Sequence, residues 1–273
     1  MQICIAQINY SRDNLQRHVR KIKNVISTYK TSDLIVFPEL ILHGHPSYER
    51  PEPFLYRKMK KVSAFISGDL YRHVRSEKAR VIIGELKQSG EQYYNLATYV
   101  DIRSIQSYAK THIHWSENFV PGAELKVFRS PLGEIGITIC FDAAFSEVWR
   151  VLALMGARVI VNIAAVPESF PTEYMRRRLA GAAIHNQVFV VYANRPGPYF
   201  SGGSGVFGPR GEIQVEADAK ERIIQAEIDV DEIDTWRHEE QIYANRRPLL
   251  YRQIARRSPA HLHTISPQPG DLN

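Results

Sequence analysis

Glu39, Lys110 and Cys140 are the residues of this chain whose types and positions best suit covalent chemistry. Each closes a run of residues typical of a β-strand, and the three runs are residues 34–39, 104–110 and 134–140. In α/β proteins, ligands bind at the carboxyl ends of the strands. A carboxylate, an ammonium group and a thiol that meet there supply a base, an oxyanion partner and a nucleophile, which indicates acyl transfer.

Of the two cysteines, Cys140 is the better candidate for a nucleophile. A free cysteine is often a buried structural side chain, and Cys4, inside the first predicted strand, is assigned to the core. A sharp turn from strand to helix after Cys140 would lift its sulfur out of the sheet and direct backbone N–H groups at a bound acyl oxygen. A buried structural role for Cys140 is the alternative.

Glu39 and Lys110 also have a simpler interpretation, because charged residues often mark exposed strand ends. Glu39, however, follows an apolar strand and Pro38, which ends the hydrogen-bonded ladder at the edge of the core. A carboxylate at this edge can accept and return a proton. The ammonium group of Lys110 can stabilise an oxyanion, and Glu117 is near enough in sequence to pair with Lys110 or to orient Glu39.

The elements that must position these residues alternate between strand and helix. The predicted strands are residues 2–8, 34–37, 80–86, 93–100, 105–109, 134–140, 158–163, 188–194, 205–207, 212–215 and 222–228, and the predicted helices are residues 13–29, 54–78, 146–155 and 172–186. Apolar stretches such as 159–166 indicate strands buried on both faces, and the helices are too few to surround an eight-stranded barrel. We therefore predict an α/β fold in which two sheets pack face to face with helices outside.

Length and composition are those of a globular protein, with 273 residues of which 44% are hydrophobic. No linker rich in Ser, Gly or Pro precedes residue 258, so residues 1–257 are predicted to form one domain. Residues 258–273 hold three prolines and a glycine and are predicted to be a C-terminal tail without a core of its own.

Composition also limits the partners and the compartment. No apolar run approaches the ~20 residues that span a bilayer, and the strand-like N-terminus lacks the basic region of a signal peptide. Two cysteines give no disulfide framework, so a reducing, cytoplasmic setting is expected. The net charge of +6 includes basic clusters at 176–178 and 246–257, but no nucleic-acid-binding motif accompanies them. We expect a small-molecule substrate, and neither a nucleic-acid nor a membrane partner.

Three short motifs, in order, resemble those of the nitrilase superfamily, the carbon–nitrogen hydrolases, and of its amidase-like branch. The motifs are Phe37-Pro38-Glu39-Leu40, Lys110-Thr111-His112 and Ile139-Cys140-Phe141-Asp142. The resemblance covers nearly all of the chain before the tail. It implies a four-layer α-β-β-α sandwich of two mixed sheets, a Glu39–Lys110–Cys140 triad and a supporting role for Glu117. It also implies that no metal and no organic cofactor are needed.

The same resemblance implies a mechanism. Glu39 takes the thiol proton while Cys140 attacks a carbonyl carbon, and Lys110 and the backbone N–H of Phe141 hold the oxyanion. An amine leaves, and water hydrolyses the resulting thioester. A small-molecule amide is the expected substrate, while a nitrile, an N-carbamoyl compound or acyl transfer to another amine stays open. The residues expected to form the walls of the substrate pocket are His43, His45, Tyr48, Phe119 and Phe145.

The chain departs from the family pattern in two places. Phe145-Ser146-Glu147 lacks the proline that the family often has between the aromatic and the acidic residue, which loosens the turn. Members that take N-carbamoyl amino acids often have arginines soon after the strand that follows. Residues 164–167 contain none, so a substrate carboxylate is not expected there.

Two functions of other classes compete with this hypothesis. Three H-x-H pairs occur, namely His43/His45, His112/His114 and His261/His263. Residues two apart on a strand share a face, so such a pair could bind zinc in a metal-dependent amidohydrolase. A non-catalytic binding module is the other alternative. The G-x-G-x-x-G stretch at 203–208 is followed by turn residues and not by a helix, which argues against a nucleotide-binding loop.

The predicted helices 146–155 and 172–186 carry apolar and small side chains that permit close packing. Together with the resemblance, they indicate a homodimer or a higher homo-oligomer, because a self-complementary surface generates a two-fold pair. Either apolar stripe could instead pack on its own sheet.

Overall fold

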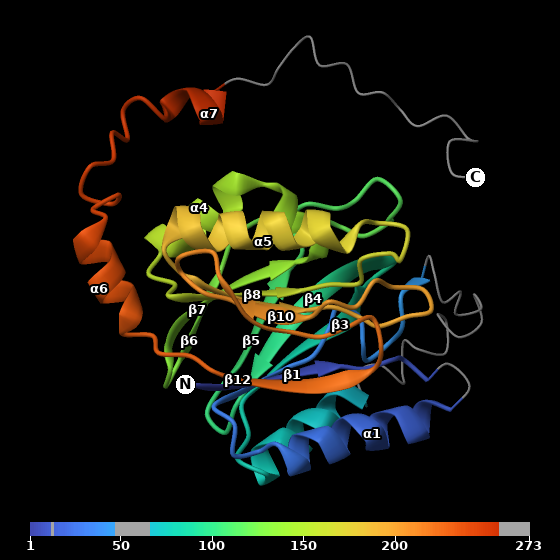
Figure 1. Cartoon of the computed structure of the whole chain (residues 1–273). Coiled ribbons are helices and arrows are strands. Elements are labelled where there is room, and N and C mark those ends of the chain that lie inside the picture. The colour runs from blue at the N-terminus through green and yellow to red at the C-terminus, as the bar shows by residue number, and fades with distance from the viewer. Residues whose placement is uncertain (12–13, 47–65, 257–273) are drawn as a thin grey trace. The chain divides into compact units, whose positions relative to one another are not determined.

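The computed structural model describes residues 1–11, 14–46 and 66–256 (Figure 1). By its internal contacts the chain divides into two units, Met1–Trp236 and Arg237–Asn273, and each is described by itself. The predicted domain boundary after residue 257 falls outside the described residues and stays a prediction. In the second unit, residues 237–239 end helix α6 (Glu232–Glu239), and residues 240–256 form turns, loops and the short helix α7 (Arg252–Arg256).

Six strands of the first unit form a mixed sheet in the order β12-β1-β2-β3-β4-β5. They are β1 (Gln2–Gln7), β2 (Leu34–Val36), β3 (Val81–Ser89), β4 (Gln92–Val100), β5 (Ile105–Ala109) and β12 (Arg222–Glu227). β1, β2 and β3 are parallel, and β4, β5 and β12 are each antiparallel to a neighbour. This first sheet carries the segments that lead to Glu39 and Lys110.

The second sheet repeats this plan in the order β11-β10-β9-β8-β7-β6. Its strands are β6 (Val127–Ser130), β7 (Gly133–Ile139), β8 (Val159–Ile163), β9 (Phe189–Ala193), β10 (Gly205–Phe207) and β11 (Ile213–Glu216). Here β7, β8 and β9 are parallel, and the remaining strands are antiparallel to their neighbours. Cys140 follows β7 directly.

Apolar side chains from both sheets meet in one core, with Ile3 and Ile5 from β1 packed in the same cluster as Ile137 and Ile139 from β7. On its outer face, the first sheet is covered by α1 (Leu15–Thr28) and by helical residues 66–76. Helices α4 (Ser146–Leu154) and α5 (Thr172–Asn186) cover the second sheet on the opposite side (Figure 1). The predicted α-β-β-α sandwich of two mixed sheets is confirmed.

The predicted elements are present, with three differences. Of the predicted helix 54–78, residues 66–76 are described and helical. Strand β6 and helices α6 (Glu232–Glu239) and α7 are additional, since their short sequences carry no clear apolar period. Cys140 does not end β7 but begins the 3₁₀-helix η1 (Cys140–Ala144). In the described part of the chain, no helix is both long enough and apolar enough to cross a membrane.

Candidate active site

Glu39 lies in the turn that follows β2. This turn packs its backbone directly on β3 at Gly84, where a Cβ atom would overlap the carbonyl oxygen of Pro38 and lie 2.6 Å from Cα of Glu39. Only glycine permits so close an approach. The next residue, Leu40, has a φ of 49°, a left-handed conformation that turns the chain sharply. As a result, the side chain of Glu39 is fully buried.

Lys110 follows β5 directly, and its backbone is held on both sides. Its N–H donates to the carbonyl of Asn95 at 2.9 Å, which extends the ladder between β4 and β5 by one residue. Its carbonyl accepts a 2.8 Å hydrogen bond from the N–H of Gly122. A Cβ atom on Gly122 would overlap the carbonyl oxygen of Ala109, so glycine is required here too. The Lys110 side chain is fully buried.

Lys110, Glu39 and Glu117 form a buried ion cluster. Nζ of Lys110 lies 3.1 Å from Oε1 of Glu39, and 2.9 and 2.8 Å from the two carboxylate oxygens of Glu117. Burial alone would lower the pKa of Lys110, but the acidic groups around it, Glu39 first, raise the pKa above its ordinary value. Burial would raise the pKa of Glu117, yet His45 and Lys110 hold it below its usual range. The lysine therefore stays a cation.

Cys140 has a φ of 45°, so the backbone turns in the left-handed region at the candidate nucleophile itself. Burial raises the pKa of the Cys140 thiol well above its ordinary value, and the charge of Glu39 raises it further. Lys110 and the backbone N–H of Ala165 act in the opposite direction. The thiol is therefore neutral at neutral pH, within electrostatic reach of the ion cluster. Nothing in the sequence motifs pointed to Ala165.

Asp142 joins the Cys140 turn to the segment around Lys110. This fully buried carboxylate accepts hydrogen bonds from four backbone or hydroxyl donors at 2.8 to 3.0 Å, and Nδ1 of His112 lies 3.0 Å from its Oδ1. The donors are the Ile139 N–H, the Tyr108 hydroxyl, the Thr111 hydroxyl and the His112 N–H. The first belongs to β7 of the second sheet, and the other three lie in or just after β5 of the first sheet. One side chain thus fixes the Cys140 turn against the Lys110 segment, a role that no sequence motif predicted.

Two of the predicted pocket residues contact the site. Nε2 of His45 lies 3.5 Å from Oε1 of Glu117, and both side chains are almost fully buried. The ring of Phe145 stacks on His112, with 3.9 Å between the ring centroids. His45 therefore belongs to the ion cluster, and Phe145 braces the segment that follows Lys110.

The other predicted pocket residues lie elsewhere or outside the described residues. His43 is fully buried, its Nδ1 accepts the N–H of Leu86 at 2.9 Å, and burial lowers its pKa to about 3. Phe119 packs with Leu40 and Leu86 in a small apolar cluster. Tyr48 lies outside the described residues. A substrate contact for these three residues stays a prediction.

The histidine pairs do not form a metal centre in the described part of the chain. No group of three or more His, Cys, Asp or Glu side chains among residues 1–11, 14–46 and 66–256 could hold a metal ion. His43 and His45 have the different partners given above, and His112 binds Asp142. The pair His261/His263 lies outside the described residues.

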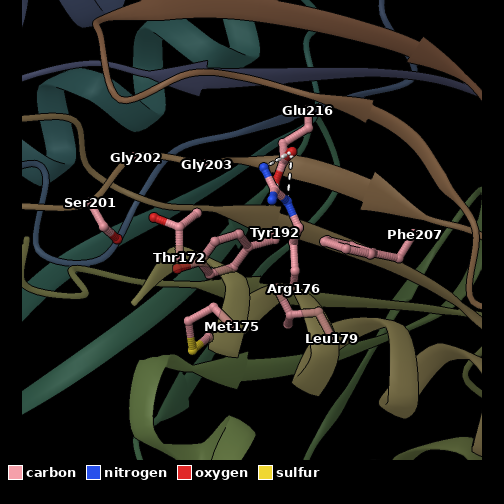
Figure 2. A pocket seen from close by; sticks show the side chains of 10 residues that line it. All are labelled: Thr172, Met175, Arg176, Leu179, Tyr192, Ser201, Gly202, Gly203, Phe207 and Glu216. Carbon is pink, nitrogen blue, oxygen red and sulfur yellow. Dashed lines mark hydrogen bonds and ion pairs between the residues drawn. The ribbon is translucent and has the colours of Figure 1, made fainter. Parts of the chain in front are cut away.

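A pocket lies between α5 and strands β9 and β10 (Figure 2). Its lining residues are Thr172, Met175, Arg176, Leu179, Tyr192, Ser201, Gly202, Gly203, Phe207 and Glu216. Arg176 binds Glu216 through Nε at 2.7 Å and Nη2 at 2.6 Å, as Figure 2 shows. Burial raises the pKa of Tyr192, and electrostatic interaction with the ionisable groups of Cys140 and Glu39 raises that pKa further. An ion pair thus forms part of the wall of this pocket, and Tyr192, another wall residue, lies within electrostatic reach of Cys140 and Glu39.

The profile of the carbon–nitrogen hydrolase family matches residues 2–238. A nitrilase of Pyrococcus abyssi is 29% identical over 241 residues, which are 84% of this chain and 90% of the relative. An (R)-stereoselective amidase of Pseudomonas sp is 27% identical over 259 residues, 92% of this chain and 93% of the relative. An N-carbamoylputrescine amidase of Solanum tuberosum is 31% identical over 196 residues, 62% of this chain and 65% of the relative.

Solved structures share the fold. The carbon–nitrogen hydrolase from Helicobacter pylori G27 superposes with a TM-score of 0.84 at 21% identity, over 94% of this chain and 99% of that chain. An amidase from Nesterenkonia sp. AN1 superposes with a TM-score of 0.80 at 20% identity, over 93% of this chain and 96% of that chain. In that structure, an amidase mutant carries the acetamide moiety of fluoroacetamide covalently on its active-site cysteine.

Proposed function

Since this chain belongs to the carbon–nitrogen hydrolase family, we propose that it hydrolyses a small-molecule amide through a thioester on Cys140. The observation that carries the proposal is the buried cluster in which Lys110 bridges Glu39 and Glu117 within electrostatic reach of a neutral thiol. A carboxylate, a fixed cation and a thiol in one site provide a base, a charge stabiliser and a nucleophile.

The first half of the reaction forms the thioester. Oε2 of Glu39 has no hydrogen-bond partner among the described residues, so this oxygen is available to take the proton of the Cys140 thiol. The sulfur attacks the carbonyl carbon, and the carbonyl electron pair moves to the oxygen. The Lys110 ammonium group and the backbone N–H of Phe141 stabilise that oxyanion. When the C–N bond breaks, Glu39 gives its proton to the leaving nitrogen.

The second half releases the acid. Glu39 takes a proton from a water molecule, which attacks the thioester carbonyl and forms a second tetrahedral oxyanion. The C–S bond then breaks, the carboxylic acid leaves, and the proton held by Glu39 returns to the sulfur of Cys140. All groups return to their starting state, so no redox partner is consumed.

An amide is the proposed substrate because two of the relatives named above are amidases. A nitrile, an N-carbamoyl compound and transfer of the acyl group to another amine are the competing reactions, and all use the same thiol chemistry. A screen for ammonia release over aliphatic and aromatic amides, N-carbamoyl compounds and nitriles tests the choice. Added hydroxylamine should divert the acyl-enzyme to a hydroxamate. Turnover of nitriles alone would contradict the proposed substrate.

The proposed nucleophile is tested by Cys140→Ala, which should abolish turnover and leave thermal unfolding nearly unchanged. Iodoacetamide should add one carbamidomethyl group to the wild type at Cys140 and none to the variant. Cys4 provides the internal comparison, because it is buried and burial raises its pKa to about 12. Ammonia release by Cys140→Ala would contradict the mechanism.

Chelation separates this mechanism from that of a metal-dependent amidohydrolase. Dialysis against EDTA should leave the rate of ammonia release unchanged, because the proposed base, nucleophile and oxyanion partners are all side chains or backbone of the chain. Activity that is lost to EDTA and restored by zinc would instead support a metal site that includes one of the H-x-H pairs.

A homodimer is proposed with the same function. Val148 and Leu152 of α4 are buried within the protein, whereas Val151, Leu154 and Met155 remain 39%, 47% and 43% exposed beside α5. An apolar stripe of this kind favours burial against a second copy. Light scattering at low micromolar concentration should give about twice the 31.3 kDa of one chain. A single-chain mass would contradict the dimer.

A further inference from the structure

Asn95 is a fully buried asparagine of β4 whose side chain reaches the proposed base. Its Nδ2 group donates to Oε1 of Glu39 at 2.6 Å. We propose that Asn95 is a positioning residue that selects which oxygen of Glu39 acts as the base. The inference rests on the proposed function, in which Glu39 accepts the thiol proton of Cys140.

The two oxygens of Glu39 have different surroundings. Oε1 accepts from both Asn95 and Lys110, at 2.6 and 3.1 Å. Oε2 is buried and has no hydrogen-bond partner among the described residues. A carboxylate with both donors on one oxygen presents the lone pairs of the other to an incoming proton. The hydrogen bond from Asn95 therefore keeps Oε1 out of the proton transfer and holds Oε2 for it.

Asn95 also sets the distance between the base and the cation. Its backbone carbonyl accepts the N–H of Lys110 at 2.9 Å, while its side chain binds Glu39. In the sheet, Asn95 pairs with Leu86 of β3, two residues beyond the glycine that supports the Glu39 turn. One strand residue thus contacts both charged groups. A shift of about 1 Å in such an arrangement is enough to cost ~100-fold in rate.

The amide is suited to this role because it is a neutral donor. It orients the carboxylate without adding a second cation, so Glu39 keeps its negative charge and its capacity to accept a proton. Aspartate has nearly the same shape but offers an acceptor where Glu39 needs a donor. Two carboxyl groups at this distance must share a proton, and they repel each other once that proton is lost.

A second buried asparagine supplies a matched control. Asn162 lies in β8 of the other sheet, is equally buried, and donates one side-chain hydrogen bond, from Nδ2 to the Thr138 hydroxyl at 2.9 Å. Its Oδ1 atom, like that of Asn95, has no partner among the described residues. Asn162→Asp makes the same chemical change in a buried strand without touching Glu39. If Asn95 only stabilises the fold, the two variants should behave alike.

The experiment measures the rate at which iodoacetamide alkylates Cys140 in the full chain, by intact mass, across the pH range in which each variant stays folded. Asn95→Asp should react like the wild type at mildly acidic pH, where the shared proton keeps a donor on Oε1. At mildly alkaline pH it should be slower by ~10-fold or more, because the introduced charge displaces the base. Asn162→Asp should keep the wild-type pH profile.

Asn95→Ala extends the test in case the aspartate variant does not fold. It should lower the limiting rate of alkylation by ~10-fold at every pH, with little change in the iodoacetamide concentration that gives half of this rate. A wild-type pH profile in Asn95→Asp, or a wild-type limiting rate in folded Asn95→Ala, would overturn the inference.

Failure of this inference is distinct from failure of the proposed function. If the wild type and Cys140→Ala take up iodoacetamide equally, the proposed function is wrong whatever the Asn95 variants do. If only the wild type reacts, and the Asn95 and Asn162 variants lose rate in parallel with their loss of folded protein, then the role of Asn95 alone is wrong.

Discussion

The two sheets contribute to the candidate site in different ways. The first sheet leads to Glu39 and Lys110, charged groups that are held to each other and to Glu117 by contacts of 2.8 to 3.1 Å. The second sheet leads to Cys140, which is placed by a backbone turn with a φ of 45°. The charged half of the site is thus organised by contacts among charged side chains, and the Cys140 half by a backbone turn that the Asp142 side chain anchors.

The difference follows from the cost of burial. A buried charge needs a partner, because desolvation costs several kcal/mol unless pairing and hydrogen bonds offset it. A neutral thiol has no such requirement, and burial keeps the Cys140 thiol neutral by raising its pKa. Cys140 can therefore be held by a backbone turn that Asp142 anchors, without a charged partner of its own, and in the proposed mechanism it acquires a charge only when Glu39 removes its proton.

The largest effect is expected from Lys110→Ala, which removes the cation of the charged half. The turnover rate should fall at least ~100-fold, the usual effect of losing one oxyanion donor. The free energy of unfolding should fall by roughly 3–5 kcal/mol, because Glu39 and Glu117 are left as buried, uncompensated carboxylates. Both are measured by steady-state kinetics and urea unfolding, with Lys87→Ala, at an exposed position of β3, as the control. A stable, active Lys110→Ala would refute the assignment.

The next largest effect distinguishes two glycines, one in each sheet. Gly84→Ala should lower both activity and stability, because the added methyl would meet the backbone of Pro38, Glu39 and Leu40. Gly136→Ala in β7 should be milder, since its nearest contacts are side chains, Ile160 Cγ1 at 3.0 Å among them. We expect a difference of roughly 1–3 kcal/mol in unfolding free energy from the strain.

The glycine pair is checked by thermal unfolding and by turnover of the best amide of the screen. Equal losses of stability and activity in Gly84→Ala and Gly136→Ala would show that the Glu39 turn does not require a residue without a side chain at position 84.

A smaller effect is expected where the two halves meet. Asp142→Asn replaces one acceptor oxygen with a donor and leaves at least one of its hydrogen-bond donors unmatched. The expected loss is roughly 1–3 kcal/mol in stability, with a several-fold fall in turnover as the Cys140 turn loosens from the Lys110 segment. Asp101→Asn is the control, because Asp101 is also a buried loop carboxylate but binds Arg103 and Ser104. An Asp142→Asn enzyme with normal turnover would mean that the turn holds Cys140 by itself.

The last effect concerns acid stability alone and leaves the proposed chemistry untouched; it belongs to the first sheet and the helix α1 that covers it. Burial lowers the pKa of His18 to about 4 and that of His43 to about 3. In the unfolded chain both protonate near pH 6.5, so between pH 6.5 and about 4 the unfolded state binds more protons. The free energy of unfolding should therefore fall as pH falls, by up to about 1.4 kcal/mol per pH unit for each histidine.

Urea unfolding at several pH values measures this slope, and His43→Gln should reduce it. A constant free energy of unfolding across this window would show that the two histidines are not held neutral in the fold.

Much of the scaffold could be predicted because the spacing of apolar residues and the length of each apolar run determine where helices and buried strands form. Helix α5 begins and ends where the pattern predicts, and the apolar runs locate each buried strand. The positions of Glu39 and Lys110 just past two strands followed from those runs. The left-handed conformation of Cys140 could not be predicted in this way, because the residue type of a non-glycine residue does not reveal a positive φ.

The residues that support the site could not be predicted from local sequence patterns, for a different reason. Asn95 meets Glu39 across 56 residues, and Asp142 meets Tyr108 across 34. A polar residue within a strand or after a cysteine is compatible with many partners, and only the packed sheets decide among them. His18, buried in the apolar stripe of α1 with its ring bonded to the Ile41 carbonyl, is a similar case.

The pairing of β1 with β12 has a consequence for the order of events during synthesis. The N-terminal amine of Met1 donates to the carbonyl of Ile228, 227 residues later, and β12 completes the edge of the sheet beside β1. Glu39, Lys110 and Cys140 leave the ribosome long before that strand does. Contacts so distant in sequence form slowly, and an unpaired strand edge is prone to aggregate. The nascent chain therefore carries all three residues of the proposed triad while the edge of β1 is still open, a stage at which chaperones would have their greatest effect on the yield of folded protein.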